Sequence, residues 1–122
     1  MLIKNKNMKK EKIGLVYHKK RIEIPVNKVS GLEIFMGLMF RRRKNAKALL
    51  FEFEKPTNLK IHSFFVFFPF LAIWIDEKNK ILKKKIVKPW EISVSPSVKF
   101  KKLIEIPINS LYRNILKVLV GS

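Results

Sequence analysis

The sequence predicts a mainly β fold, a compact single-domain β-sandwich or barrel of about seven or eight short strands. Three observations carry this prediction. Apolar and polar residues alternate in short runs, most clearly over Arg21–Val26, turn residues separate these runs, and no long helical pattern intervenes. With 122 residues, of which 48% are hydrophobic, the chain has the size and composition of one globular domain. We expect a flexible basic arm over residues 1–12 and one β-rich domain over residues 13–122.

The first half of the domain is predicted to contain a hairpin, a short helix and a further strand. Ile13–His18 and Arg21–Val26 form the hairpin, because a polar Lys-Lys pair separates two strand-like runs. Ser30–Glu33 has the form of a capping box, and apolar residues at helical spacing follow it. A helix near residues 31–38 is therefore expected, with the next strand at Lys47–Glu54.

The second half is predicted to consist mostly of strands. Aromatic and β-branched residues favour strands at Ile61–Phe68 and Phe70–Ile75, or one long strand bent at Pro69. A hairpin turn leads to Ile81–Val87, and Phe100–Ile106 forms a later strand. A second helix is expected near residues 110–116, and Ile115–Val120 either continues it or forms a last strand.

Three stretches of the chain form a pattern through their order and spacing. They are Ser30-x-x-Glu33-x-x-x-Gly37-Leu38-Met39-Phe40-Arg41, the run from His62 to Asp76 around Pro69, and Leu103-Ile104-Glu105-Ile106-Pro107. Together they resemble the uncharacterised family called domain of unknown function 192, and Lys88-Pro89-Trp90 resembles a segment of its archaeal members. The resemblance implies a compact, mainly β sandwich or barrel with one short helix at the Gly-Leu-Met motif. It implies no established function.

The chain departs from the pattern of that family at polar positions. Ile34 stands where the family usually has Arg, and Leu71 stands where it usually has Asp. Packed apolar residues can replace a buried ion pair at little cost. We therefore interpret the two changes as the replacement of a structural pair rather than the loss of catalytic residues.

The net charge of +18, from 27 Lys and Arg against 9 Asp and Glu, predicts attraction to anions such as nucleic acids, acidic lipids and phosphorylated molecules. Arginine side chains grip phosphate and carboxylate groups through two hydrogen bonds. A basic run is also commonly just a solvated loop. The candidate anion or ligand contacts are Arg41, Arg42, Arg43, Lys44, His62 and Trp90.

The aromatic residues of Phe64–Phe68 allow two interpretations. They could form a platform on which the bases of a single-stranded nucleic acid stack. Because they lie in the most apolar run of the chain, we favour core packing instead, and Trp90 beside Lys88 is the better candidate for an exposed aromatic residue.

No catalytic residue, metal ligand or cofactor site is predicted. The chain has no cysteine, which excludes disulfides, thiolate zinc sites and a cysteine nucleophile, and which is in keeping with the cytoplasmic location that we expect. His62 and Ser63 are adjacent and would point to opposite faces of a strand, which argues against a Ser–His couple. The apolar run Phe64–Ile75 is too short to cross a membrane as a helix.

Three hypotheses of function follow, in this order of preference. The first is a non-enzymatic binding or accessory module with an unknown ligand. The second is a nucleic-acid-binding protein that uses its basic loops. The third is an enzyme that acts on a small anionic substrate where His62, Ser63 and the loop at Arg41 meet.

Overall fold

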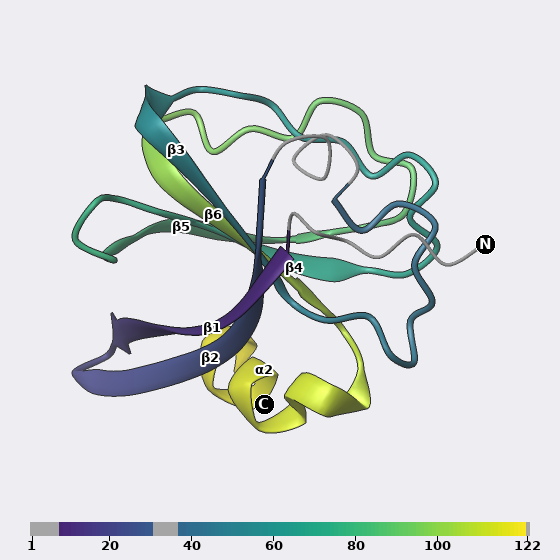
Figure 1. Cartoon of the computed structure of the whole chain (residues 1–122), viewed down its shortest axis with the longest axis horizontal. Coiled ribbons are helices and arrows are strands. Elements are labelled where there is room, and N and C mark those ends of the chain that lie inside the picture. The colour runs from purple at the N-terminus through teal and green to yellow at the C-terminus, as the bar shows by residue number, and fades with distance from the viewer. Residues whose placement is uncertain (1–7, 31–36, 122) are drawn as a thin grey trace.

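Six strands form one curled sheet in the order β1-β2-β3-β6-β4-β5 in the computed structural model, which describes residues 8–30 and 37–121 (Figure 1). Neighbouring strands are antiparallel except for β2 and β3, which are parallel. The strands are β1 (Met8–Tyr17), β2 (Lys20–Val29), β3 (Leu49–Thr57), β4 (Phe70–Ile75), β5 (Ile81–Val87) and β6 (Phe100–Pro107). A 3-10 turn, η1 (Ser110–Tyr112), leads into helix α2 (Arg113–Val120). The predicted fold class is thus confirmed, as a half-barrel.

The N-terminal hairpin is longer than the sequence pattern indicated. Strand β1 begins at Met8 rather than at Ile13, and residues 8–12, which were expected within the basic arm, pair with β2. This extension arises because β2 itself continues past Val26 to Val29, which gives residues 8–12 a partner strand. The rest of the arm, and residues 31–36 of the expected helix, lie outside the described residues. Within the described part of that helix, residues 37–40 form a turn.

The prediction of a strand at Ile61–Phe68 is wrong. This segment is an irregular loop that forms a single bridge, between Ile61 and Val94, and turns at Phe64 and Phe65. The physical reason lies at Ser63, whose backbone and hydroxyl groups bond to another loop rather than to a strand. The described residues therefore form six strands rather than seven or eight. The predictions of β4, β5, β6 and a C-terminal helix are confirmed, and Ile115–Val120 continues that helix.

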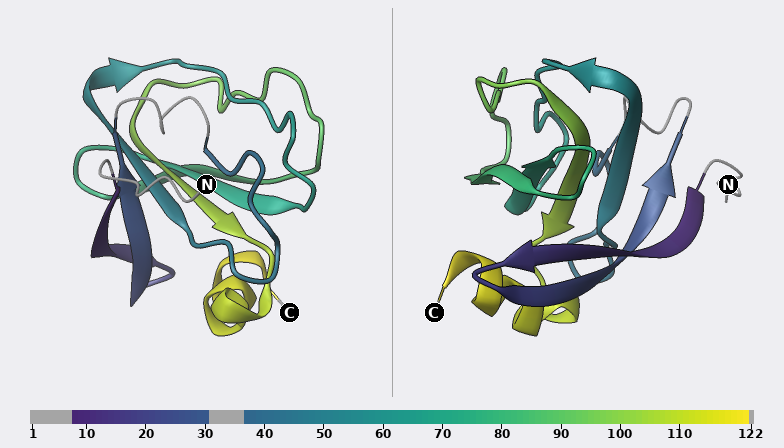
Figure 2. Two further views of the ribbon diagram at one scale, coloured as in Figure 1. Left: turned by 45° about the vertical axis from the view of Figure 1, so that its right-hand side comes forward. Right: turned by 90° about the vertical axis from the view of Figure 1, so that its left-hand side faces the viewer.

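The sheet is buried on both faces. One core contains Leu49, Phe51, Phe70, Trp74 and Phe100 and is covered by the loops around Leu38, Val66 and Val94. The other core contains Ile13, Ile24, Leu71, Ile73 and Ile104 and is covered by the β1–β2 hairpin and by α2 (Figure 2). All six residues of β4 are buried, because its two faces belong to the two cores.

Lys84 closes the curl of the sheet by joining its two edge strands. Its ammonium group, on β5, donates to the hydroxyl of Tyr17 on β1 at 2.7 Å and to the carbonyl of Leu119 in the last turn of α2. It also lies 4.4 Å from the centre of the Tyr17 ring. A cation in this place is stabilised by the negative end of the helix dipole.

Tyr112 fixes the start of the C-terminal helix against the sheet. The tyrosine is buried, and its hydroxyl accepts a hydrogen bond of 2.6 Å from the backbone N–H of Ala48. Burial raises the pKa of Tyr112 above its ordinary value. The hydroxyl therefore stays neutral and satisfies a donor that water does not reach.

The second core also accounts for Leu71, one of the two apolar replacements in the sequence. Leu71 packs with Ile73 and Ile104, on the face of the sheet opposite to Gly37, which lies close to Phe51 and Glu105. Ile34, its expected counterpart, lies outside the described residues.

One carboxyl group is buried in the core that the loops cover. Glu105 lies on β6 between β3 and β4, opposite Leu49 and Ala72, and is only 5% exposed. No hydrogen bond or ion pair reaches its carboxyl group from the described residues. Loss of hydration on burial raises the pKa of Glu105 to about 8.

We predict that Tyr112→Phe lowers the free energy of unfolding by about 1–3 kcal/mol, because the N–H of Ala48 is left buried without an acceptor. Urea unfolding measures the change. Tyr17→Phe is the matched control. It should lower the free energy of unfolding less, since Lys84 retains its hydrogen bond to the carbonyl of Leu119. Equal stability of Tyr112→Phe and wild type would contradict the assigned hydrogen bond.

We predict that Glu105→Gln stabilises the protein in a manner that depends on pH. The unfolded chain loses the glutamate proton near pH 4.5, whereas the folded protein keeps it until about pH 8. The folded state binds more protons in this interval, so the free energy of unfolding of the wild type falls as pH rises through it. The variant avoids this loss, and its advantage should grow from near zero at pH 4 to on the order of 4 kcal/mol above pH 8.

Urea unfolding of both proteins at pH 4, 6 and 8.5 measures this difference. Glu54→Gln, at an exposed position of β3, serves as the control and should show no such growth. A constant difference between Glu105→Gln and wild type at all three pH values would show that the Glu105 carboxyl titrates normally.

Candidate functional site

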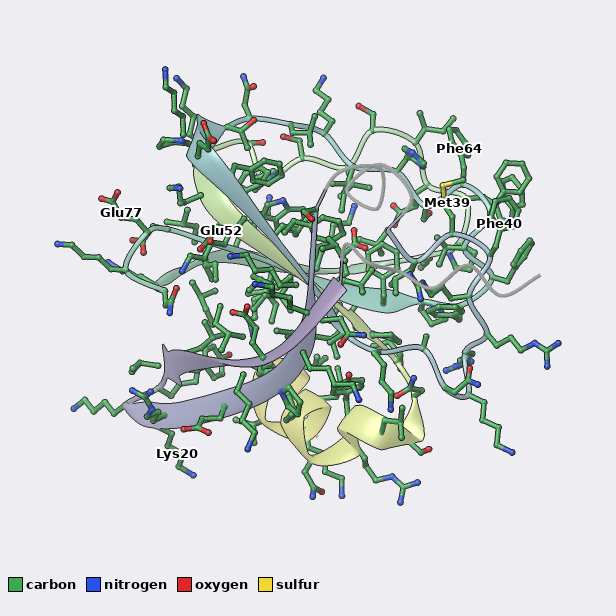
Figure 3. All side chains as sticks on the ribbon, in the orientation of Figure 1. Lys20, Met39, Phe40, Glu52, Phe64 and Glu77 are labelled. Atoms are coloured by element: carbon green, nitrogen blue, oxygen red, sulfur yellow. The ribbon has the colours of Figure 1, made fainter. Side chains whose placement is uncertain are left out.

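Five aromatic side chains gather on the surface where three loops meet. The aromatic cluster consists of Phe40, Phe64, Phe65, Phe67 and Trp90. Phe40 is 63% exposed, Phe67 61% and Trp90 48%. Figure 3 shows Phe40 and Phe64 at the same end of the molecule, on the opposite side from Glu77. Exposed aromatic residues in such number on a small protein commonly mark a binding surface.

Trp90 is the centre of this aromatic cluster. Its ring centroid lies 5.0 Å from that of Phe65, 5.9 Å from Phe67 and 6.2 Å from Phe64. Phe40 stacks on Phe65 with a centroid distance of 5.0 Å and an interplanar angle of 22°. These contacts hold the rings in fixed orientations while their outer faces remain open to solvent.

Ser63 ties together two of the loops that carry the cluster. Its hydroxyl donates to the carbonyl of Lys88 and accepts from the N–H of Glu91, both at 2.6 Å. Its carbonyl accepts from the N–H of Trp90 at 3.0 Å. The third loop joins through the N–H of Phe40, which donates to the carbonyl of Phe65 at 2.9 Å. The hydrogen bonds thus organise the cluster before any ligand arrives.

Three residues of the cluster have a strained backbone. Phe40, Phe65 and Trp90 adopt φ values of 61°, 56° and 63°, in the left-handed region that bulky residues rarely enter. Each such residue costs on the order of 1–3 kcal/mol. The loop hydrogen bonds maintain this strain, which directs large apolar side chains outward.

The three loops carry positive charge around the aromatic cluster. Arg41 and Arg42 follow Phe40, Lys88 precedes Trp90 by two residues, and Glu91 is the only acidic residue of the loops over 37–46, 62–69 and 88–94. The Glu91 carboxylate accepts from the N–H of Lys88 at 2.7 Å and pairs with Lys85 at 3.3 Å. These interactions, first of all the bond from Lys88, lower the pKa of Glu91.

The structure brings some of the sequence-predicted contact residues together and separates others. Trp90 belongs to the aromatic cluster, and His62 lies beside it, with its ring centroid 5.0 Å from that of Phe64. Arg43 turns away and donates to the carbonyl of Ile108 at 2.8 Å. Lys44 lines the same groove along α2 as Arg43. The basic run is therefore divided between two surfaces.

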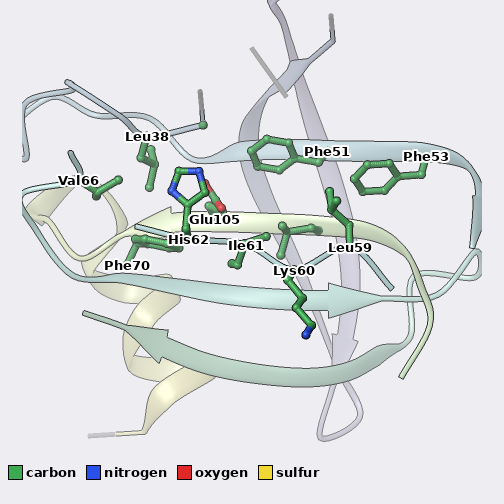
Figure 4. Close-up of a pocket in the computed structure, with 12 residues that line it drawn as sticks. Leu38, Phe51, Phe53, Leu59, Lys60, Ile61, His62, Val66, Phe70 and Glu105 are labelled. Carbon is green, nitrogen blue, oxygen red and sulfur yellow. The ribbon is translucent and has the colours of Figure 1, made fainter. Parts of the chain in front are cut away.

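A cavity of about 100 Å³ lies next to the aromatic cluster, beneath the loops (Figure 4). Its walls are largely apolar, and its titratable lining side chains, among the residues described, are Glu105, His62 and Lys60. In Figure 4 the Lys60 side chain points away from Glu105. Apolar wall residues include Leu38, Phe51, Phe53, Val66, Phe70 and Leu103.

Gly37 is required at the edge of this cavity. Its φ is 51°, and a Cβ atom added there would lie 3.1 Å from Oε1 of Glu105. A side chain at this position would therefore be strained and would crowd the carboxyl group. The Gly-Leu-Met motif and the Ile-Glu-Ile-Pro strand, which lie far apart in the sequence, meet at this point.

Sequence reasoning missed Glu105 as a site residue. The available signal was a lone carboxylate between Ile104 and Ile106, in a segment, Leu103–Pro107, whose other residues are apolar on both faces of the strand. Such a strand is buried on both sides, so the carboxylate also has to lie in the core.

The hypothesis of an enzyme with Ser63 as a participating group does not fit the geometry. Ser63 is fully buried, and its hydroxyl is occupied by the two hydrogen bonds to the loop at residues 88–91. The His62 ring uses Nδ1 to accept from the N–H of Phe64 at 3.2 Å. Ser63 therefore organises the loops and is not placed to attack a substrate.

The part of the chain that the structure describes contains neither a metal-binding cluster nor a membrane-spanning helix. No three of its His, Asp and Glu side chains gather closely enough to hold a metal ion. None of its helices has the length and apolar character needed to cross a membrane.

Comparison with known proteins places this arrangement in a family. Residues 9–118 match the family model DUF192, described as Uncharacterized ACR. A UPF0127 protein of Pyrococcus abyssi is 33% identical over 85 residues, which is 70% of each chain. One from Pyrococcus horikoshii is 29% identical over 72 residues, covering 59% of this chain and 62% of the relative.

Two crystal structures share the fold. A protein of unknown function from Novosphingobium aromaticivorans has a TM-score of 0.71 and 14% identity, over 87% of this chain and 78% of the other. A candidate transcription regulator from Sinorhizobium meliloti has a TM-score of 0.74 and 17% identity, over 89% and 88%. The family match covers nearly the whole sheet and both motifs that meet at the cavity. The chain belongs to the DUF192 family of uncharacterised proteins, as the resemblance implied.

Proposed function

We propose that this protein is a non-enzymatic binding domain of the cytoplasm and that its ligand is a single-stranded nucleic acid, bound at the aromatic cluster. The observation that supports this proposal is the set of exposed, fixed rings at Phe40, Phe67 and Trp90. The preference for core packing of Phe64–Phe68 applies only in part, because Val66 and Phe68 are buried while Phe65 and Phe67 are exposed.

Stacking accounts for the preference for a single strand. The flat face of an unpaired base can lie on an exposed ring, and one such contact contributes about 1–3 kcal/mol. Bases within a duplex already stack on one another and offer no free face. Trp90, with three aromatic neighbours, is the principal platform in this proposal.

The positive charge of the protein favours a nucleic acid over an uncharged apolar partner at the aromatic cluster. The net charge of +18 attracts a polyanion, and Arg42 and Lys88 on the loops of the cluster are exposed for contacts with phosphate groups. The only carboxylate of these loops, that of Glu91, is already paired with Lys85. A phosphate backbone along the cluster therefore meets little repulsion.

The name of one structural neighbour is in keeping with a nucleic-acid ligand. The Sinorhizobium protein is called a candidate transcription regulator. At 17% identity the likeness shows the fold alone, so the proposal depends on the aromatic cluster and the charge.

We predict that the full-length protein binds a fluorescent 12-nucleotide oligo-dT at 50 mM salt and that affinity falls steeply up to 200 mM salt. Trp90→Leu should weaken binding by about ten-fold or more, because the substitution keeps an apolar side chain but removes the stacking face. Fluorescence anisotropy measures affinity, and quenching of the exposed Trp90 reports contact directly, since Trp74 is buried.

Leu111→Ala is the control, because it also shortens an exposed apolar side chain but lies on η1, outside the three loops of the aromatic cluster. It should bind like wild type. A duplex of the same sequence should bind more weakly than the single strand. Undetectable binding at 50 mM salt, or equal affinity of Trp90→Leu and wild type, would refute stacking at this cluster. Binding to anionic phospholipid vesicles without binding to the oligonucleotide would assign the cluster to a membrane surface instead.

A further inference from the structure

The cavity beside the aromatic cluster has the properties of a separate small-molecule site. It has a volume of about 100 Å³, and Glu105 and Gly37 both line it. An apolar cavity of about 150 Å³ admits benzene. The cavity therefore fits a ligand, or part of one, with roughly four or five non-hydrogen atoms.

Glu105 is the polar group that such a ligand would meet. It is 5% exposed, and neither the neighbouring strands nor the covering loops offer its carboxyl group a partner among the described residues. Buried carboxyl groups are normally hydrogen-bonded or paired, because an unsatisfied one lowers stability. A group retained in this state has capacity left for a ligand.

The rest of the lining indicates the charge of that ligand. Phe51, Phe53 and Phe70 contribute aromatic rings, whose faces attract cations when hydration is excluded. A carboxylate combined with aromatic and aliphatic walls is complementary to an organic ammonium ion. His62 and Lys60 are the other titratable side chains at the cavity, and both are exposed to solvent, where water screens their charge.

We propose that this cavity binds a small primary amine with an apolar body, its ammonium group paired with the carboxylate of Glu105. The site is independent of the aromatic cluster, so either one can exist without the other. Two segments of the family motif, at Gly37 and at Glu105, line it. The amine provides a charge partner that the described residues of the core do not supply.

The proposal predicts a particular dependence on pH. Burial raises the pKa of Glu105 to about 8, and the amine needs the ionised form. Binding is then linked to release of the Glu105 proton, so affinity should rise with pH below 8 and level off above it. The expected change is about 25-fold between pH 6.5 and pH 8.5.

Isobutylamine is the probe, since its five non-hydrogen atoms match the cavity, and ligand-observed NMR with a titration of the full-length protein measures its dissociation constant. At pH 8.5 it should bind at least ten-fold more tightly than isobutanol, its neutral analogue, and than isobutyrate. Wild-type protein alone provides this comparison and the pH series, so neither depends on a variant.

Glu105→Gln then tests the partner directly. The variant should lose at least ten-fold in affinity for isobutylamine and should lose the pH dependence, while it keeps oligonucleotide binding at the aromatic cluster. Glu52→Gln is the control. It removes a carboxylate that pairs with Lys28 on the surface, away from the cavity, and should bind the amine like wild type. Tighter binding of isobutanol than of isobutylamine at pH 8.5, or an affinity for the amine that does not change with pH, would overturn the proposal.

Discussion

The rest of the structure depends on one constraint, the burial of β4 and β6 on both faces. These neighbouring strands lie inside the sheet, and all six residues of β4 face one core or the other. Each face therefore needs a cover that excludes water. On one face the β1–β2 hairpin and α2 provide it, joined to β5 by Lys84. On the other face the cover consists of loops. Both candidate sites, the aromatic cluster and the cavity at Glu105, lie in this loop cover.

A cover made of loops needs hydrogen bonds for its backbone, because no ladder supplies them. Ser63 supplies several of these hydrogen bonds, since its backbone and hydroxyl groups bond to Lys88, Trp90 and Glu91. This fixation turns Val66 and Phe68 inward and leaves Phe65, Phe67 and Trp90 outward. The same bonds that seal the core thus create the exposed aromatic cluster, at the expense of strain at Phe40, Phe65 and Trp90.

The loop cover also explains why a buried carboxyl group can persist. Regular packing would have closed the space over Glu105, whereas the loops leave a cavity of about 100 Å³ there. Gly37 keeps its own side of the cavity open, because any side chain would crowd the carboxyl oxygen. A buried carboxyl group and an open volume therefore lie at the same place in a largely apolar core.

Sequence patterns predicted the parts of the fold in which local and tertiary preferences agree. Alternation at Ile22, Ile24 and Val26 identified the hairpin, and the apolar run Phe70–Ile75 identified the central strand. The pattern failed at Ile61–Phe68, where strand-like residues form a loop because Ser63 bonds to a distant segment. No local pattern reports a partner 25 residues away.

The candidate sites were predictable to a different extent. Trp90 was expected to be exposed, and His62 was among the predicted contacts. Both rings lie next to Phe64, and this placement depends on hydrogen bonds between the loops, which the sequence does not reveal. The Arg41–Lys44 run was predicted as a set of candidate anion contacts, but the Arg43 side chain donates to the carbonyl of Ile108 instead. Glu105 could have been singled out from its apolar neighbours in Leu103–Pro107, whereas its cavity depends on Gly37 and the covering loops.

Glu105 lies in the core with no partner for its carboxyl group among the described residues, and the titration of this group tests that placement most directly. Carbon-detected NMR can follow all glutamate carboxyl signals between pH 3 and 10, with Glu105→Gln used to assign the signal. The account predicts that one signal titrates near pH 8 and disappears in the variant. A Glu105 signal that titrates near pH 4.5 or below would show a hydrated or paired carboxylate and would contradict the account.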